Sequence, residues 1–546
     1  MNKQFSPLCL LSIGVFAFFS LTTSVQAQKI AETYQDLTKA ARKGMLVNAV
    51  LTDEGNIRLT YKMKIDKKSD EVAYEDYVFD PALSFKGVQP SKNTKDTHPD
   101  KTVTTLSAYV GGSNSFNVLS MSLKLQKETW ERLWDYDKQS YKWGKRLSKE
   151  EVKPRNSDSK YKGFASFAND DEGSVSVLAS YEQDKDDNDQ FVLLYVTNDL
   201  NVKETKLPLQ GSYSLVYCDS RNNGNIFALF APNKGMSDTR MYKFIECTPK
   251  GDVVSNTDFT APSTNTLIMG HREIEDALYF VAGSTKSNDA YNQEFTSYAP
   301  ISNPGYSTSA NKQMDKYEKK LFGTEFANIH FLKVANGKLA FASTTPVKEF
   351  KSKVVTPPSQ KKAHPYEGKR FYINNMSITP AGEILVTGQL QAKKIVNGGN
   401  DIEYRYYDFV CLHFNKDGSL KAQYNVEKMM DDSKSEMFSS PQSFVFSPDG
   451  NTAYWEIKEV KGAKGYSSFV DAYLGNTTFT AHYFPRIATI NLANAKVSDF
   501  TVFANKGKFL LYRYNNAVMD EKNKTVYYIG HDEDYEKIWV GKYQFQ

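Results

Sequence analysis

Apolar and polar positions alternate with a period of two along most of this chain. The clearest stretch, residues 443–457, reads S-F-V-F-S-P-D-G-N-T-A-Y-W-E-I. Its two apolar arms flank a Pro-Asp-Gly segment, in which Gly450 supplies the positive φ of a tight turn and Pro448 presets its entry. This pattern predicts two short antiparallel strands joined as a hairpin.

Hairpins of the same kind recur along the chain. Each has two apolar arms around a short polar turn, and the turns are centred on Gly55, Gly112, Gly173, Gly224, Asp276, Gly382, Gly450 and Asn523. Successive centres lie about 51 to 73 residues apart, except for one interval of about 106. Several units continue into a second strand–turn–strand pattern, as in F-V-L-L-Y-V-T-N-D-L-N-V-K-E-T-K-L-P. Four strands in a repeat of this length are typical of a β-propeller blade.

The sequence therefore predicts an all-β chain folded as one β-propeller domain over residues 45–546. Eight hairpins favour eight blades of four antiparallel strands. The count becomes nine if residues 331–343 open a blade of their own, and seven if the first hairpin only closes the ring. We favour eight, because residues 331–343 fit the outer strands of the blade that begins near Asp276. The last unit ends one strand short, so we expect a strand from the other terminus to complete it.

The first 27 residues have the pattern of a secretory signal peptide. Lys3 precedes an apolar stretch at 8–21, and V-Q-A at 25–27 forms a small-residue cleavage site. The apolar stretch is short for a membrane span, and Cys9 lacks the small residues that precede a lipidated cysteine. We therefore expect export to the periplasm or the cell exterior, without a membrane span. A lead segment at 28–44 should follow, with a short helix at 28–43 closed by Gly44.

The S-P-D-G-N-T-A-Y-W turn resembles the S-P-D-G repeats of TolB-like and WD40-like propellers. The match is specific at residues 443–457 and extends to the other hairpins only as a pattern. The resemblance implies the architecture and agrees with export, because such propellers are common among exported proteins of Gram-negative bacteria. It implies little about activity, since propellers carry many different functions.

Composition narrows the class of protein. Without Lys3 the chain has 67 basic and 64 acidic residues, and this near neutrality argues against a nucleic-acid or membrane-surface protein. Tyr and Phe, 34 of each, suit β-structure. Cys218, Cys247 and Cys411 lie in apolar strand-like runs, which predicts buried thiols rather than a disulfide framework. Cys218 and Cys247 fall on the first and third strands of one predicted sheet, too far apart to be bridged.

The lengths of the connections distinguish the two faces of the predicted disc. Turns between first and second strands, and between third and fourth strands, share one face and are short. The long segments, 284–327, 346–369, 393–404 and 458–486, fall on the other face. Ligand sites concentrate in loops carried by a rigid scaffold, so we expect binding at this elaborated face.

Two groups of residues on the elaborated face are candidates for ligand binding. The first is a basic segment with aromatic residues that suits an anionic glycan or acidic partner: Lys361, Lys362, His364, Tyr366 and Arg370. The second is a set of aromatic residues that suits sugar stacking: Tyr466, Tyr473 and Tyr483. The alternatives are a solvated linker for the first group and aromatics that pack their own loop for the second.

The sequence predicts no catalytic residue, metal site or cofactor. The segment Q-D-K-D-D-N-D-Q lacks the glycine and the final glutamate of a calcium loop, and no zinc, P-loop, Rossmann or G-x-S-x-G pattern occurs. His271 and His330 lie in apolar strands, as expected of structural histidines.

We expect a monomeric, non-catalytic exported propeller that binds a glycan or an envelope protein, with no nucleic-acid partner. A carbohydrate-active enzyme is an alternative, and requires two carboxylates about 5–10 Å apart in the central funnel. An outer-membrane β-barrel is another, but arms such as S-F-V-F-S are shorter than the usual membrane strand of about 9–11 residues.

Overall fold

The computed structural model describes residues 30–64, 72–91, 101–112, 121–135, 140–152, 161–169, 173–182, 189–233, 240–285, 325–360, 363–369, 371–396, 401–430, 435–466 and 478–546. The predicted signal peptide lies outside these residues. Among the helices within them, none is both long enough and apolar enough to cross a membrane.

Strands of the described residues form eight separate sheets, which we number as blades in chain order. Blade 1 contains β2 (Met45–Leu51), β3 (Ile57–Lys64), β4 (Val72–Phe79) and β5 (Phe85–Ser91). Blade 2 contains β6 (Lys101–Gly112), β7 (Met121–Asp135) and β8 (Ser140–Val152). Blade 3 contains β9 (Lys162–Asn169), β10 (Ser174–Glu182), β11 (Asp189–Val196) and β12 (Val202–Lys206). Blade 4 contains β13 (Tyr213–Ser220), β14 (Ile226–Pro232), β15 (Met241–Cys247) and β16 (Val253–Thr260).

The second half of the chain repeats this plan with small additions. Blade 5 contains β17 (Thr266–Ile274), β18 (Ala277–Ser284), β19 (Asn328–Ala335) and β20 (Lys338–Pro346). Blade 6 contains β22 (Phe371–Ile378), β23 (Ile384–Val396), β24 (Asp401–Phe414) and β25 (Leu420–Val426), and the short β21 (Val354–Val355) pairs with β25. Blade 7 contains β26 (Gln442–Phe446), β27 (Thr452–Tyr466), β28 (Thr478–Asn491), β29 (Lys496–Val497) and β30 (Thr501–Val502). Blade 8 contains β31 (Leu510–Leu511), β32 (Ala517–Asp520), β33 (Thr525–His531), β34 (Lys537–Gln544) and β1 (Ile30–Asp36).

Helical structure in the described residues is limited to single turns. These are η1 (Ala41–Lys43), α3 (Val347–Ser352), η3 (Ser435–Met437) and α5 (Ala504–Gly507). The prediction of an all-β chain is confirmed.

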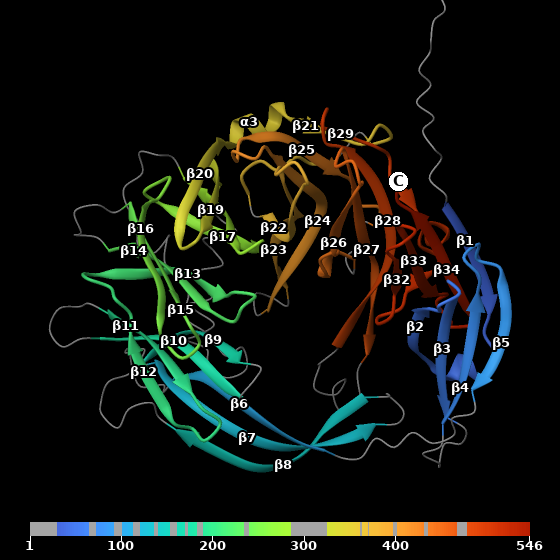
Figure 1. Cartoon of the computed structure of the whole chain (residues 1–546), viewed down its shortest axis with the longest axis horizontal. Helices are drawn as coiled ribbons and strands as arrows, with labels where there is room; N and C mark the ends of the chain where they lie inside the picture. Colours follow the sequence, from blue (N-terminus) through green and yellow to red (C-terminus); the bar gives the residue numbers. More distant parts are fainter. Residues whose placement is uncertain are drawn as a thin grey trace, which may run out of the picture.

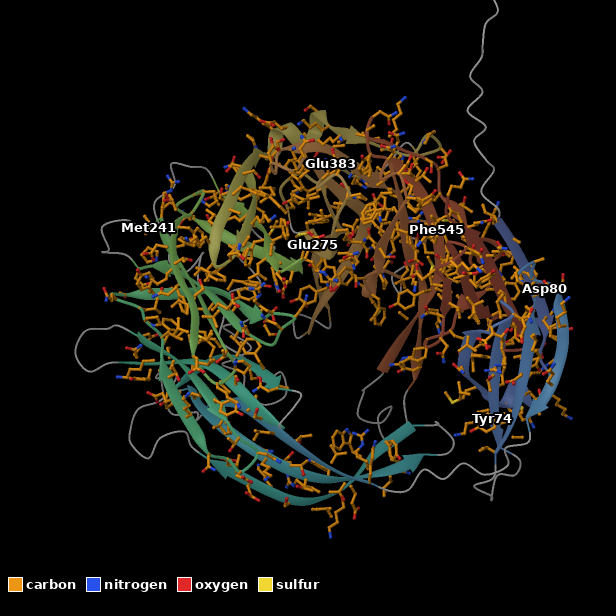
Figure 2. The ribbon with its side chains drawn as sticks, viewed as in Figure 1. Tyr74, Asp80, Met241, Glu275, Glu383 and Phe545 are labelled. Atoms are coloured by element: carbon orange, nitrogen blue, oxygen red, sulfur yellow. The ribbon has the colours of Figure 1, made fainter. Side chains whose placement is uncertain are left out.

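The sheets follow one another around a ring, with the first strand of each sheet toward the centre and the last toward the outside (Figure 1). Figure 2 accordingly places Glu275, in the β17–β18 turn, near the centre, and Met241, in β15, at the periphery. In blades 1 to 7 each predicted hairpin joins the first two strands, and in blade 8 it joins β32 and β33, with β31 also paired to β33. Residues 331–343 lie in β19 and β20, the outer pair of blade 5, as the favoured count of eight requires. The fold is an eight-bladed β-propeller.

The short turns have a common geometry that explains their sequence. At Gly55, Gly224, Gly382 and Gly450 the φ angle lies between 70° and 84°, which glycine adopts without steric strain. The amide of each glycine donates to the carbonyl oxygen three residues earlier, for example from Gly224 to Arg221 at 2.9 Å. A turn closed in this way needs few residues, so the face that carries these turns stays compact.

Apolar clusters join neighbouring blades. Seven clusters connect blades 2 and 3, 3 and 4, 4 and 5, 5 and 6, 6 and 7, 7 and 8, and 8 and 1. Each arises because alternate residues of a strand face opposite sides of the sheet and both sides are covered by a neighbour. Among the described residues, no such cluster joins blades 1 and 2.

The N-terminal strand completes blade 8. Residues 30–36 of β1 pair antiparallel with β34, from Ile30 opposite Tyr543 to Asp36 opposite Lys537. This confirms closure by the other terminus. It also corrects the predicted helix at 28–43: among its described residues only η1 is helical, and residues 30–36 form a strand of the ring. The open edge of β34 offers backbone hydrogen bonds that override the helix propensity of this stretch.

The three cysteines lie inside the sheets as free, buried thiols. Cys218 on β13 and Cys247 on β15 are separated by β14, which confirms their predicted placement. Burial raises the pKa of the Cys247 thiol to about 12, so the thiol stays protonated and packs as a small apolar group.

Candidate functional site

The middle parts of the predicted long segments 284–327, 393–404 and 458–486 lie outside the described residues. β23–β24 and β27–β28 are pairs of long strands, and the link from blade 5 to blade 6 contains α3 and β21, which lie at the outer rim of the ring near β25 (Figure 1). Three of the residues predicted to bind a ligand, Lys361, Lys362 and Arg370, lie outside the described residues, as does Tyr473. Tyr466 ends β27, and its side chain lies outside the described part of the chain.

His364 is held at the surface by Asp408. A bulge in β24, opposite Gln389 and Gln391, changes the direction of the strand at Asp408. One oxygen, Oδ2, accepts bonds from the His364 backbone N at 2.9 Å and from its Nδ1 at 2.8 Å. The other, Oδ1, accepts from the Lys428 backbone N at 3.1 Å. The His364 side chain is 82% exposed, so Asp408 orients the imidazole and anchors the link.

Tyr366 does not have the role expected of it. Its side chain is fully buried, between the rings of Phe350 at 5.7 Å and Phe371 at 5.6 Å. The backbone N of Tyr366 donates to the Gln423 side chain at 2.7 Å. The ring therefore secures the link to blade 6 and is not offered to a ligand. Both rings are near Tyr366 in the sequence, but only the folded link shows that they enclose it.

Tyr483, on β28, is half-buried against the core between blades 7 and 8. This burial raises the pKa of its phenol. A sugar-stacking role for the remaining exposed part of the ring stays a prediction.

A polar groove of about 500 Å³ lies between blades 3 and 4, on the short-turn face. Blade 3 contributes the end of β9, the start of β10 and Tyr195 of β11. Blade 4 contributes the β13–β14 turn at 220–224 and the β15–β16 turn at Pro249 and Lys250. Two hydrogen bonds from blade 3 to blade 4 hold the walls of the groove together. Ser176 Oγ donates to the carbonyl oxygen of Pro249 at 2.8 Å, and Lys203 Nζ donates to the carbonyl oxygen of Lys250 at 3.0 Å.

Arg221 forms part of the groove wall and is bound by two buried carboxylates. Its Nη1 lies 3.0 Å from Glu246 Oε2, and its Nη2 lies 2.7 Å from Glu273 Oε1. Arg221 Nη2 also donates to the Asp276 carbonyl. The Asn222 backbone N donates to the second oxygen of Glu273 at 2.6 Å. The positive charge of Arg221 is thereby neutralised within the protein, and the cluster joins the β13–β14 turn and β15 of blade 4 to β17 of blade 5.

The remaining groove lining is mainly amide and hydroxyl groups with some apolar surface. Its polar side chains are Asn169, Ser174, Ser220, Asn222, Asn223 and Lys250, and its apolar members include Phe167, Ala168 and Pro249. Asparagine amides both donate and accept hydrogen bonds. These residues were not among the sequence-predicted site residues. The R-N-N-G-N turn appeared only as a hairpin signal, and its proximity to blade 3 depends on blade packing.

Other buried carboxylates in the described residues also have cationic or histidine partners. Glu459 Oε2 lies 2.9 Å from Arg486 Nε, and both side chains are at most 1% exposed. Glu383 is bound to Lys421 and, at 2.9 Å, to His413. His271 bonds to Tyr217, and His330 bonds to Ser284 and Thr344, as expected of structural histidines. No group of three or more potential metal ligands occurs among the described residues.

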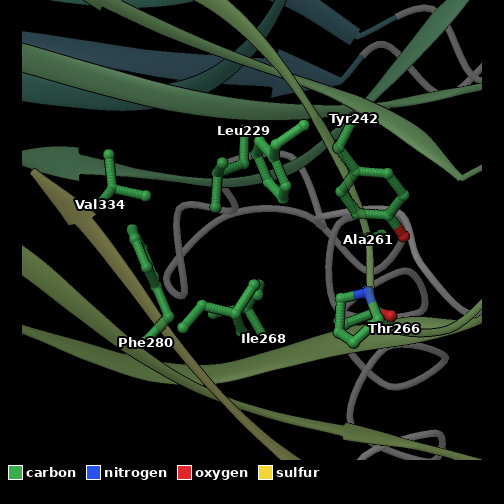
Figure 3. Close-up of a pocket in the computed structure, with 10 residues that line it drawn as sticks. Leu229, Tyr242, Ala261, Thr266, Ile268, Phe280 and Val334 are labelled. Atoms are coloured by element: carbon green, nitrogen blue, oxygen red, sulfur yellow. The ribbon is translucent and has the colours of Figure 1, made fainter. Parts of the chain in front are cut away.

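A second, much smaller cavity lies between blades 4 and 5 (Figure 3). Its lining is mostly apolar and includes Leu229, Ile268, Phe280 and Val334. Its volume is about 10 Å³, which is at most the space of one water molecule. It is a packing gap in the core and not a ligand site.

Comparison with known proteins identifies no family. No family model matches the sequence, and no curated protein is similar to it at a significant level. Solved structures with similarity include the WD40 domain of SCAP from fission yeast, at 10% identity and a TM-score of 0.24, covering 95% of this chain and 98% of that one. An α-L-arabinofuranosidase from Fusarium graminearum has 10% identity and a TM-score of 0.24, covering 70% and 93%. A levansucrase variant from B. subtilis has 12% identity and a TM-score of 0.23, covering 63% and 86%. At these TM-scores the similarity gives no information about the ligand or activity of this chain.

Proposed function

We propose that this protein is an exported, non-catalytic propeller that binds a neutral glycan in the groove between blades 3 and 4. The observation that carries this proposal is the groove itself, which combines a volume of about 500 Å³ with a lining of amides, hydroxyls and a few apolar groups. Pockets of this size that combine apolar surface with a few placed polar groups are typical of small-ligand sites.

The charge of the groove favours a neutral ligand. Arg221 is bound to Glu246 and Glu273, so it is not available for an incoming carboxylate or phosphate. Of the groove-lining residues that the structure describes, only Lys250 adds a further cation, and it lies at the exposed β15–β16 turn. Sugar hydroxyls both donate and accept hydrogen bonds, which matches the amides of Asn169, Asn222 and Asn223.

The carboxylates beside the groove support binding rather than glycoside cleavage. A glycosidase needs one carboxylic acid that donates a proton and one carboxylate that acts on the sugar or on water. Glu246 is 4% exposed and Glu273 is 6% exposed, and both are bound to the same guanidinium. Held in this way, they stabilise the junction of blades 4 and 5.

Filling the groove tests the proposal. The Asn222→Trp substitution places an indole at an exposed turn position that lines the groove. We expect the mature chain to bind a neutral oligosaccharide in a glycan array, and the variant to lose at least about tenfold in affinity by calorimetry.

The matched control is Asp53→Trp. Asp53 has the same place in the β2–β3 turn, where the Gly55 amide donates to Thr52, but it is outside the groove. This variant should bind like the parent. Equal affinity of Asn222→Trp and the parent for every bound glycan would remove the groove as the site. Release of reducing ends from a bound glycan would instead favour the carbohydrate-active enzyme.

A further inference from the structure

Blade 2 presents aromatic and cationic side chains in alternation on one face. The Arg132 guanidinium lies 4.0 Å from the ring centroid of Trp143. The ring centroids of Trp143 and Trp130 lie 5.6 Å apart in a T-shaped arrangement, and the Arg146 guanidinium lies 5.7 Å from the centroid of the Trp130 ring. At the end of the same strands, Lys101 Nζ lies 4.1 Å from the Tyr141 ring. We call this surface the ladder face: Lys101, Glu128, Trp130, Arg132, Tyr141, Trp143 and Arg146.

The ladder face is opposite the side that packs against blade 3. Leu125 of β7 belongs to the core shared with blade 3. Trp130 and Arg132 are separated from Leu125 by odd numbers of residues, so they stand on the other face of the strand. No apolar cluster covers that face among the described residues, and Trp143 is 54% exposed.

A bulge in β8 brings the cationic and aromatic members of this strand together. Trp143 and Arg146 are three residues apart, which in a regular strand would place them on opposite faces. In β8 they lie opposite Arg132 and Trp130, which are only two residues apart on β7. The extra residue turns both side chains to the ladder face. Strand bulges often direct side chains at functional sites.

Glu128 holds the ladder in place. Its two carboxylate oxygens accept bonds from Arg146 Nη1 at 2.9 Å and from Trp130 Nε1 at 3.1 Å. The Glu128 pKa is lowered: burial alone would raise it, but these hydrogen bonds and the nearby cations outweigh that effect. The Trp130 ring and the Arg146 guanidinium are therefore positioned before any ligand arrives, which reduces the entropic cost of binding.

The charge of blade 2 identifies the kind of ligand. Its three strands carry eight Lys and Arg residues against five Asp and Glu residues. This excess of basic residues equals that of the whole chain counted without Lys3. Three ring–cation pairs along one face match a polymer whose units each offer a ring and an anionic group. Flat apolar ring faces stack on such units, while Lys and Arg pair with carboxylate or sulfate groups.

We infer that the ladder face binds an acidic polysaccharide. A nucleic acid fits less well, because Glu128 lies in the middle of the ladder and nucleic-acid sites are more strongly basic. The inference is independent of the groove, which lies between blades 3 and 4 on the short-turn face and suits a neutral ligand.

Calorimetry with polygalacturonate, and with dextran as the neutral probe, tests this inference on the mature chain. The parent should bind polygalacturonate, and affinity should fall as salt rises from about 0.1 M to about 1 M, since the Debye length shrinks from ~10 Å to ~3 Å. Trp143→Ala should weaken binding by at least about tenfold. Arg146→Gln should weaken it and reduce its dependence on salt. Dextran should not compete.

Tyr514→Ala is the matched control. Tyr514 in blade 8 is 63% exposed, and the Arg513 guanidinium lies 5.3 Å from the centroid of its ring. It should bind like the parent, as should Asn222→Trp, and thermal melting should show Trp143→Ala folded. Parent-like binding by folded Trp143→Ala would overturn the inference. A second contrary result would be that Lys361→Glu/Lys362→Glu loses binding while Trp143→Ala keeps it. That result would assign the ligand to the basic segment that contains Lys361 and Lys362. Single-stranded DNA that binds as tightly as polygalacturonate would also overturn it.

Discussion

Single residues in this protein act mainly through backbone geometry and burial. Gly450 has a φ of 70°, and a Cβ built there would lie 3.1 Å from Pro380 Cβ in the turn of blade 6. The position thus needs glycine both for its own φ and for the close approach of a neighbouring blade. The S-P-D-G motif was informative because such a requirement is local and is visible in the sequence.

We expect Gly450→Ala to lower the free energy of unfolding by about 1–2 kcal/mol, because an L-residue is strained at this φ. Gly462 is the control: it lies in β27 without a positive φ, and a Cβ there meets nothing within 4 Å. Gly462→Ala should change stability little. Urea unfolding of the three proteins gives the comparison, and equal midpoints would show that the turn geometry is not as described.

At the scale of the element, the strands at the two ends of the chain depend on each other. β1 covers the edge of β34 over residues 30–36, and the Glu32 carboxylate accepts a bond from Trp539 Nε1 at 2.9 Å. Removal of β1 would expose an unpaired edge strand next to the C-terminus, and such edges promote aggregation.

A chain that begins at residue 38 should therefore melt at a lower temperature and aggregate more readily than one that begins at residue 28. A synthetic peptide of residues 28–37, added in excess, should restore the melting temperature by binding only the folded ring. Differential scanning fluorimetry with light scattering measures both effects. If the truncated chain melts like the parent, closure by β1 contributes little to the stability of the ring.

At the scale of the whole molecule, stability depends on groups buried between and within the blades. His330 of blade 5 and His531 of blade 8 are 1% and 3% exposed. Burial lowers the pKa of each to about 4, against about 6.5 in an unfolded chain. Below pH 6.5 the unfolded state takes up protons that the folded state does not, so stability falls as the pH drops from 6.5 toward 4.

Each of these histidines should account for a loss on the order of 3 kcal/mol by pH 4. His330→Gln removes one titrating group and keeps a side chain that bonds to Ser284 or Thr344. The variant should therefore lose less stability than the parent between pH 6.5 and pH 4, whatever its stability at pH 7. Denaturant titrations at several pH values measure this difference, and parallel pH profiles for the two proteins would contradict it.

The sequence by itself determined the architecture. Alternation along a strand and a glycine in a turn are local requirements, so the eight hairpins, the outer strands at 331–343 and the compact short-turn face were all predictable. The missing last strand predicted closure, but not that residues 30–36 would provide it. Their helix propensity was overridden by hydrogen bonds to β34, more than 500 residues away in the chain.

Only the tertiary structure decided where concave and aromatic surfaces form. The groove joins turns of blades 3 and 4 whose residues are 46 to 81 positions apart, and the burial of Tyr366 depends on Gln423, Phe350 and Phe371. The ladder face depends on a bulge that changes which side of β8 faces outward. These features result from packing between blades and from strand register, which involve many distant residues at once and leave no short motif in the sequence.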